Sequence, residues 1–366
     1  MRVIGVDAAF VRGAIAGTAV WRGIARVAGT AVLLSAGFAP SVAQAPDGAP
    51  AAEFVVLENG SWPDAMALTH AGVGTPPERG DGAQAAADSA LQLLRQGGSA
   101  LDAAIAGTVE MEDDPRYNAG TGANIRLDGK TIQMDAALMT STGRFAAVAV
   151  IERVRNPIRV VRAVLDTPHL LLAGEGATRF AHRVGFEDVV PTCAEAEAKY
   201  VQRLARVREA LGRPGSDEFD WPAHWNFPNP LPATLQDLTR DSDTVGTVTR
   251  DGAGQYAATL STGGTSITLY GRVGDVPVYG AGLFAGPHGA VACTGHGEEI
   301  IRQATARSVY AAIASGTPAR DAIAQAIRGF PPSSDVGIIA LDAAGWVVAA
   351  NRPMAFGLAG PERRGK

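Results

Sequence analysis

The sequence lacks most of the features that mark the common enzyme and binding classes. It has only two cysteines, Cys193 and Cys293, which is too few for a disulfide framework in 366 residues. Whether these two residues pair is left open by the sequence. The chain has no basic block, and its net charge is −5, which argues against a nucleic-acid groove or a polybasic membrane patch.

Several catalytic and cofactor-binding motifs are also absent. The chain contains no G-x-S-x-G elbow, no H-E-x-x-H, no C-x-x-C and no P-loop, and its six histidines are scattered. The Gly-rich segment at His70 lacks the second half of a dinucleotide fingerprint. These absences weaken zinc, serine-triad and nucleotide-binding hypotheses, and no cofactor is expected.

Long apolar runs are confined to the N-terminal region. The stretch Val27–Ala39 follows several arginines and precedes "SVAQA", a pattern typical of a secretory signal. It is shorter than the roughly 20 residues that a membrane span needs. We therefore predict that residues 1–45 are a signal or disordered N-terminus, cut after Ala43 or Ala45, and that the mature protein is periplasmic or secreted. A disordered tail and a membrane anchor are the alternatives.

What the chain does contain is a globular composition, 46% hydrophobic and 19% charged. Alanine and leucine at helical spacing predict a helix over 81–98, and a second helix begins at Ser99 with a capping-box-like Asp102. Asn156 and Pro157 are typical of a helix start. The segment "HLLLAG" is a candidate buried strand, and "EGATRFAHRVG" a short helix.

The second half of the chain is rich in strands. Residues 211–240 have no helical or strand period and are rich in proline, so they are predicted to be a flexible linker. Residues 244–262 and 335–351 each predict a hairpin, and 297–316 predicts one helix. Hairpins with paired helices favour an α+β fold in which helices cover antiparallel sheets.

Four short motifs remain, and together they make chemical sense. They are "DTVG" with Thr244, "STGG" with Thr262, "GRVGD" with Arg272 and Asp275, and "CTGHGE" with Thr294, Gly295 and Gly297. Arginine grips a carboxylate with its planar fork, and aspartate binds an ammonium. An N-terminal threonine has its own base, an α-amine of pKa about 7.7–8.0. Taken singly, each motif also has a plain structural explanation, such as a β-forming threonine or a surface ion pair.

These motifs, in this order, resemble the N-terminal-nucleophile asparaginase family, which includes plant-type asparaginase/isoaspartyl peptidases and glycosylasparaginases. The upstream segments "GGSALDAA", "NAGTGA", "MDAALM" and "NPIRVVRAVLDTPHLLLAGEGATRFA" resemble it too. The resemblance covers about 65–350 and implies a four-layer αββα sandwich. It also implies a precursor that cleaves itself between Asp243 and Thr244, giving an α-chain of residues 46–243 and a β-chain of residues 244–366.

The resemblance further implies roles for individual residues. Thr244 is the expected nucleophile, Thr262 is expected to tune it, and Asn118 is expected to lie beside it. Thr294 and Gly295 are expected to form the oxyanion hole. Arg272 is expected to bind the substrate α-carboxylate, and Asp275 and the Gly297 carbonyl its ammonium group. A structural sodium bound by main-chain carbonyls is possible in the loop of Met111, Glu112, Asp114, Tyr117, Ala119 and Thr121. The side chains of the acidic run "EMEDD" are more typical of a solvated helix end, so this run is expected to act through its backbone. A dimer of αβ units is also implied.

The substrate class stays open between related compounds. The expected substrates are L-asparagine and β-aspartyl dipeptides, with the release of L-aspartate, and the alternative is GlcNAc-asparagine. An aspartate directly before the expected nucleophile, here Asp243, is typical of glycosylasparaginases, whereas the sequence around Asn118 favours the plant-type branch. "MTS" at 139–141 and "TSITLY" at 265–270 depart from the family patterns "MDG" and "TNKLP". Further alternatives are a non-catalytic aspartate-binding relative and a γ-glutamyl hydrolase.

Overall fold

The computed structural model describes residues 55–60, 64–210 and 244–360. The predicted signal at 1–45, the predicted linker at 211–240 and Asp243 lie outside the described residues. Among the described residues, no helix combines the length and the apolar character needed to cross a membrane.

Two sheets form the centre of the fold. The five-stranded sheet has the order β1 (Val55–Gly60), β11 (Trp346–Ala350), β10 (Val336–Asp342), β9 (Gly289–Gly295) and β8 (Leu283–Gly286). The seven-stranded sheet has the order β12 (Met354–Ala359), β2 (Met66–Val73), β6 (Val245–Arg250), β7 (Tyr256–Thr262), β3 (Met134–Thr140), β4 (Phe145–Ile151) and β5 (Leu171–Ala173). All pairs are antiparallel except β4 with β5.

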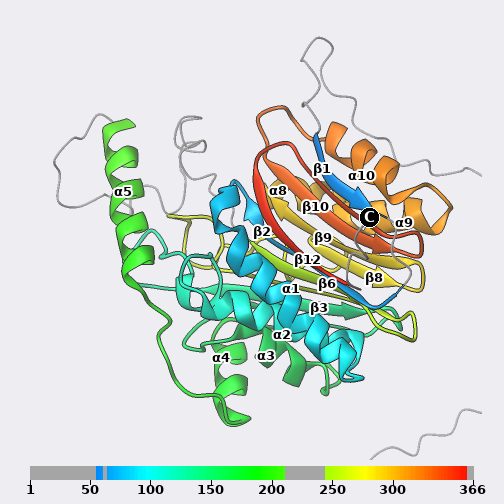
Figure 1. Cartoon of the computed structure of the whole chain (residues 1–366). Helices are drawn as coiled ribbons and strands as arrows, with labels where there is room; N and C mark the ends of the chain where they lie inside the picture. The colour runs from blue at the N-terminus through cyan, green and yellow to red at the C-terminus, as the bar shows by residue number, and fades with distance from the viewer. Residues whose placement is uncertain (1–54, 61–63, 211–243, 361–366) are drawn as a thin grey trace, which may run out of the picture. The chain divides into compact units, whose positions relative to one another are not determined.

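Helices cover the outer face of each sheet (Figure 1). The seven-stranded sheet carries α1 (Gly80–Arg95), α2 (Ala100–Asp113), α3 (Pro157–Val164) and α4 (Gly174–Arg183). The five-stranded sheet carries α8 (Gly297–Gln303), α9 (Thr305–Ala314) and α10 (Ala319–Arg328). Within the described residues, the remaining helices are α5 (Ala194–Ala210) and two 3-10 turns, Pro77–Arg79 and Gly120–Gly122. The predicted αββα sandwich is therefore confirmed.

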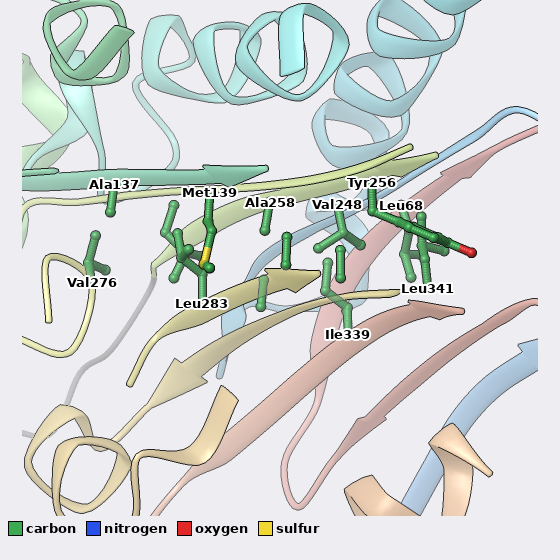
Figure 2. Packing of buried hydrophobic residues seen from close by; sticks show 14 of the residues in the cluster. Leu68, Ala137, Met139, Val248, Tyr256, Ala258, Val276, Leu283, Ile339 and Leu341 are labelled. Carbon is green, nitrogen blue, oxygen red and sulfur yellow. The ribbon is translucent and has the colours of Figure 1, made fainter. Parts of the chain in front are cut away.

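The largest apolar core lies between the two sheets. Figure 2 shows Leu68 and Val248 of the seven-stranded sheet turned toward the face that carries Leu283 and Ile339 of the other. The inward positions alternate along each strand, as the two-residue period of a strand requires. Many inward residues on both sheets are alanine, including Ala258 and Ala292, which leaves room for larger neighbours across the interface.

Several local predictions are confirmed. The Ser99 hydroxyl accepts a hydrogen bond from the Asp102 amide at 3.2 Å, so it caps α2 as the capping-box pattern predicts. The hairpins β6–β7 and β10–β11 form where turn signals were found. Cys193 and Cys293, whose pairing the sequence left open, are both free thiols.

Two local predictions are wrong. The segment "HLLLAG" was expected to form a buried strand, but β5 is a three-residue edge strand, and Leu171 is 47% exposed. The single helix expected over 297–316 is two helices, because Ala304 between them adopts φ +45° and ends α8. A residue with left-handed backbone cannot continue a right-handed helix, and no glycine or proline marks this break in the sequence.

The tight seam between α1 and β12 gives a test of the packing. A Cβ on Gly357 would lie 2.2 Å from the Ala83 carbonyl oxygen of α1. We expect Gly357→Ala to lower the free energy of unfolding by about 1–3 kcal/mol. Gly176→Ala is the control, because that glycine lies on α4 with no atom within 4 Å of its Cβ position. The control should raise the free energy of unfolding by about 0.5–1 kcal/mol. Urea titrations of the three proteins measure both changes, and equal stabilities would contradict the packing account.

Candidate active site

Three of the predicted site threonines converge where the two sheets meet. Thr244 is buried and directly precedes β6. Val245 pairs with Ser261 in the antiparallel β6–β7 ladder, so the next pair places Thr244 opposite Thr262. Thr294 comes from β9 of the other sheet, where its hydroxyl accepts a hydrogen bond from the Val73 amide at 3.3 Å. Both sheets thus contribute a threonine to one end of the sandwich.

Asn118 fixes the turn that follows Thr262. Its main-chain carbonyl accepts a hydrogen bond from the Gly263 amide at 2.9 Å, and its side-chain amide donates to the Gly264 carbonyl at 2.7 Å. The Thr262 hydroxyl in turn accepts from the Gly264 amide at 3.0 Å. A Cβ on Gly263 would lie 2.5 Å from Asn118 Oδ1, so only glycine fits there. The structure thus brings Asn118 to the strand end that carries Thr262.

The predicted substrate-binding groups surround one glycine. A Cβ on Gly297 would lie 2.9 Å from Arg272 Nη2 and 2.9 Å from Asp275 Oδ1. A cation and an anion therefore both lie against the start of α8, and any side chain at position 297 would collide with them. Such a pair matches the carboxylate and the ammonium of a free amino acid.

Asp275 is the most unusual group of the site. It is only 4% exposed, and its Oδ2 atom has no hydrogen-bond partner among the described residues. Burial raises the pKa of Asp275 to about 7, although the neighbouring Arg272 acts in the opposite direction. The next residue, Val276, is packed in the apolar core between the sheets, so the carboxylate is held in place (Figure 2).

Arg272 does not pair with Asp275 as the sequence spacing allowed. Its ion-pair partner is Glu298, which accepts hydrogen bonds from Nε at 3.1 Å and from Nη2 at 3.0 Å. Sequence reasoning missed this residue. The signal was its position directly after Gly297, in the motif "CTGHGE".

A buried arginine holds the loop that carries Arg272. The Arg126 guanidinium donates to the Thr268 hydroxyl, to the Gln133 carbonyl at 3.0 Å and to the Arg272 carbonyl at 3.3 Å. Burial lowers the pKa of Arg126 to about 10, which leaves it charged. Sequence reasoning missed Arg126 because arginine is mostly an exposed residue. In the same loop, the departure "TSITLY" places Ile267 at φ +58°, a strained conformation for a β-branched side chain.

His70 is a third group that sequence reasoning missed. It lies on β2 opposite Gly246, and a Cβ on Gly246 would lie 2.4 Å from its Nε2 atom. Burial lowers the pKa of His70 to about 3, with a small opposing contribution from the Thr244 main chain. Both ring nitrogens nevertheless lack a hydrogen-bond partner among the described residues. A neutral imidazole therefore lies beside the strand that begins at the expected nucleophile. The period of β2 could have identified it, since His70 shares the inward face with Leu68.

The acidic run at the end of α2 corrects an expectation. Glu112 was expected to be solvated, but its side chain is fully buried and accepts a hydrogen bond from the Ile158 amide at 3.0 Å. Burial raises the pKa of Glu112 to about 8, with the nearby Ser261 hydroxyl acting in the opposite direction. The other carboxyl oxygen has no hydrogen-bond partner among the described residues.

The backbone of the predicted sodium loop has carbonyls on its inner side. A Cβ on Gly120 would lie 2.4 Å from the Glu112 carbonyl oxygen, and a Cβ on Gly122 would lie 2.1 Å from that of Tyr117. Main-chain oxygens are suitable ligands for a hard cation. Among the described residues, no group of three acidic, histidine or cysteine side chains could hold a metal ion. The main-chain sodium of this loop therefore stays a prediction.

The "MTS" departure lies away from the site. In the β3–β7 ladder, Asp135 pairs with Thr262 and Thr140 pairs with Ala257, so Thr140 stands at the opposite end of the sheet from the expected nucleophile. The Ser141 hydroxyl accepts a hydrogen bond from the Tyr256 amide at 3.1 Å, which ties the end of β3 to the start of β7. The residues at 139–141 therefore serve the fold rather than the site.

Gly295 lies at the end of β9, directly after Thr294. Its backbone has a φ of +135°, and a Cβ at this position would lie only 2.2 Å from the Asp335 carbonyl oxygen. Both features require a glycine. Thr294 and Gly295 therefore enter the site region from a fixed backbone, as an oxyanion hole requires.

An αββα sandwich with a buried threonine at the start of an inner strand is the architecture of N-terminal-nucleophile hydrolases. Within that class, the chain belongs to the asparaginase family. The family model Asparaginase_2, described as Asparaginase, matches residues 69–358. The protein is thus a member of a hydrolase family that comprises asparaginases and isoaspartyl peptidases.

Curated relatives carry both activities in their names. A plant-type L-asparaginase of Thermococcus kodakarensis is 38% identical over 293 residues, which are 77% of this chain and 91% of the relative. An isoaspartyl peptidase of Salmonella typhimurium is 38% identical over 232 residues, which are 63% of this chain and 69% of the relative. A human isoaspartyl peptidase/L-asparaginase is 34% identical over 233 residues, which are 63% of this chain and 68% of the relative.

The raised pKa of Asp275 predicts a pH dependence of ligand binding. Below about pH 7 the carboxyl group is protonated in the free protein and cannot balance an ammonium charge. We expect L-aspartate to bind about tenfold more weakly at pH 6 than at pH 8. Calorimetric titration at each pH measures this without involving the nucleophile. Asp275→Asn should bind weakly and with little pH dependence, and a flat profile in the wild type would contradict the prediction.

The buried Glu112 predicts a pH dependence of stability. Its folded-state pKa of about 8 lies above the ordinary value of 4.5, so its contribution to stability is fully present below about pH 4.5 and is lost as the pH rises from there through 8. We expect the thermal midpoint of the wild type to fall between pH 5 and pH 8, and that of Glu112→Gln to fall less. The control is Asp113→Asn, because Asp113 lies on the same helix turn and forms an ion pair with Arg155. The thermal midpoint of this control should fall as much as that of the wild type. The account is wrong if Glu112→Gln follows the wild type as well.

Proposed function

We propose that this protein is an N-terminal threonine amidohydrolase that releases L-aspartate from L-asparagine or β-aspartyl dipeptides. The observation that carries the proposal is the buried Asp275 carboxylate, whose Oδ2 atom has no hydrogen-bond partner among the described residues and whose Oδ1 atom lies, like Arg272 Nη2, beside Gly297. A buried carboxylate without a partner is costly, and an ammonium group would satisfy it. The names of the relatives support the same substrate class.

Activation in this proposal is a cleavage of the chain itself. The Thr244 hydroxyl attacks the carbonyl carbon of Asp243, the amide becomes an ester, and water hydrolyses the ester. This frees the α-amine of Thr244 and leaves residues 46–243 and 244–366 as the α- and β-chains. Export of the chain and a dimer of αβ units are part of the same proposal and follow from the family resemblance and the N-terminal pattern.

In the catalytic step, Thr244 Oγ1 attacks the side-chain carbonyl carbon of the bound substrate. The free α-amine of Thr244 takes the hydroxyl proton, which suits its pKa of about 7.7–8.0. The Thr294 hydroxyl and the Gly295 amide stabilise the oxyanion. The C–N bond then breaks, the amine passes the proton to the leaving nitrogen, and water hydrolyses the aspartyl ester on Thr244.

The substitution Thr244→Ala tests activation and catalysis together. Because alanine has no hydroxyl, we expect the purified variant to stay one chain, whereas the wild type gives a second chain that starts at Thr244. Intact mass and N-terminal sequencing measure this. Thr244→Ser keeps a hydroxyl and should still be cleaved.

The substrate class is then tested on the cleaved protein. We expect the cleaved wild type to turn over asparagine or a β-aspartyl dipeptide, and the uncleaved Thr244→Ala variant to be at least about 10³-fold less active. Preferred turnover of GlcNAc-asparagine would instead assign the protein as a glycosylasparaginase. A wild type that stays one chain and binds aspartate without turning over any of these compounds would make it a binding protein.

A further inference from the structure

Glu298 has no role in the chemistry described so far, yet it touches the site directly. It is the second residue of α8 and follows Gly297, where Arg272 and Asp275 converge. Its side chain is 45% exposed and that of Arg272 is 17% exposed. Although burial acts the other way, Arg272 keeps the pKa of Glu298 below its usual value, so the carboxylate is charged at neutral pH.

The contact uses one edge of the arginine fork. Glu298 Oε1 accepts from Nε at 3.1 Å and from Nη2 at 3.0 Å, and Oε2 accepts from Nη2 at 3.1 Å. Among the described residues, Arg272 Nη1 has no such acceptor. A Cβ on Gly274 would lie 2.9 Å from Nη1, and a Cβ on Gly297 would lie 2.9 Å from Nη2. The Nη1–Nη2 end of the guanidinium therefore lies against two glycines, where a side chain at either position would collide with it.

We propose that Glu298 is a positioning residue that holds the Arg272 guanidinium so that its Nη1–Nη2 end faces the α-carboxylate of the substrate. The inference rests on the proposed function. An arginine side chain has several rotatable bonds, and its planar fork binds a carboxylate only in a narrow range of orientations. Fixing that orientation before the substrate arrives removes part of the entropic cost of binding.

Glu298 is itself held on its other side. His296 Nε2 lies 3.6 Å from Glu298 Oε2, and His296 Nδ1 lies 3.0 Å from the Ser334 hydroxyl. The carboxylate also occupies the first turn of α8, where a negative charge is favourable. These contacts restrict Glu298 and, through it, Arg272.

The test compares Glu298→Gln with Glu299→Gln in the cleaved protein. Glu299 is the matched control because it is the next residue of the same helix turn and pairs with Arg302 rather than with Arg272. For the substrate that the wild type hydrolyses, we expect KM to rise about tenfold in Glu298→Gln, with kcat within about twofold, because the α-carboxylate is remote from the bond that breaks. Glu299→Gln should keep the wild-type KM.

A substrate analogue without the α-carboxylate separates positioning from a general structural effect. For 3-aminopropanamide, which lacks that group, wild type and Glu298→Gln should have equal kcat/KM, because the loss of the carboxylate removes the interaction that Glu298 serves. Calorimetric binding of L-aspartate gives a second measure and should weaken by the same factor as KM rises.

The outcomes distinguish this inference from the proposed function. If the cleaved wild type neither hydrolyses these amides nor binds L-aspartate, the proposed function itself fails. If the wild type is active and Glu298→Gln behaves like Glu299→Gln, Glu298 has no positioning role. A lower KM in Glu298→Gln would also overturn the inference, because it is the result expected of a residue that competes with the substrate for Arg272.

Discussion

Apolar packing between the two sheets is the constraint on which the site depends. Thr244 and Thr262 belong to the seven-stranded sheet, and Thr294 belongs to the five-stranded sheet, so their relative positions are set by the face-to-face core. The same core contains Val276 and so fixes the adjacent Asp275. Close packing of this kind deforms little, which gives the site a defined geometry before any ligand binds.

Charge around the site is balanced except at one place. Arg272 has Glu298, and Asp135 accepts hydrogen bonds from the amides of Val150 and Gly274. Asp275, beside Arg272, combines deep burial with a raised pKa and an oxygen that has no partner among the described residues, as Glu112 does at the end of α2. Buried groups with perturbed pKa values are concentrated at functional sites, and Asp275 lies beside Gly297 together with Arg272. In the proposed function, the Asp275 carboxylate is therefore the group through which the fold binds the ammonium of the substrate.

Much of this fold and site could be predicted from the sequence. Hairpins and capped helices have local signals, as Ser99 and Asp102 illustrate, and the motif residues from Thr244 to Gly297 could be identified by order and residue type. What could not be predicted depends on contacts between distant segments. Arg272 pairs with Glu298, 26 positions along the chain, rather than with nearby Asp275. The burial of Glu112 and Arg126 and the break at Ala304 likewise arise from tertiary packing, which overrides local preference.

The most direct measurement of the central claim is a crystal structure of the cleaved protein with L-aspartate, the expected product. The account predicts a free α-amine at Thr244 and the ligand ammonium against Asp275. It also predicts the α-carboxylate on Arg272 and the side-chain carboxyl within reach of Thr244 Oγ1. Aspartate bound in the reverse orientation, or bound away from Arg272 and Asp275 while Thr244 is free, would contradict it.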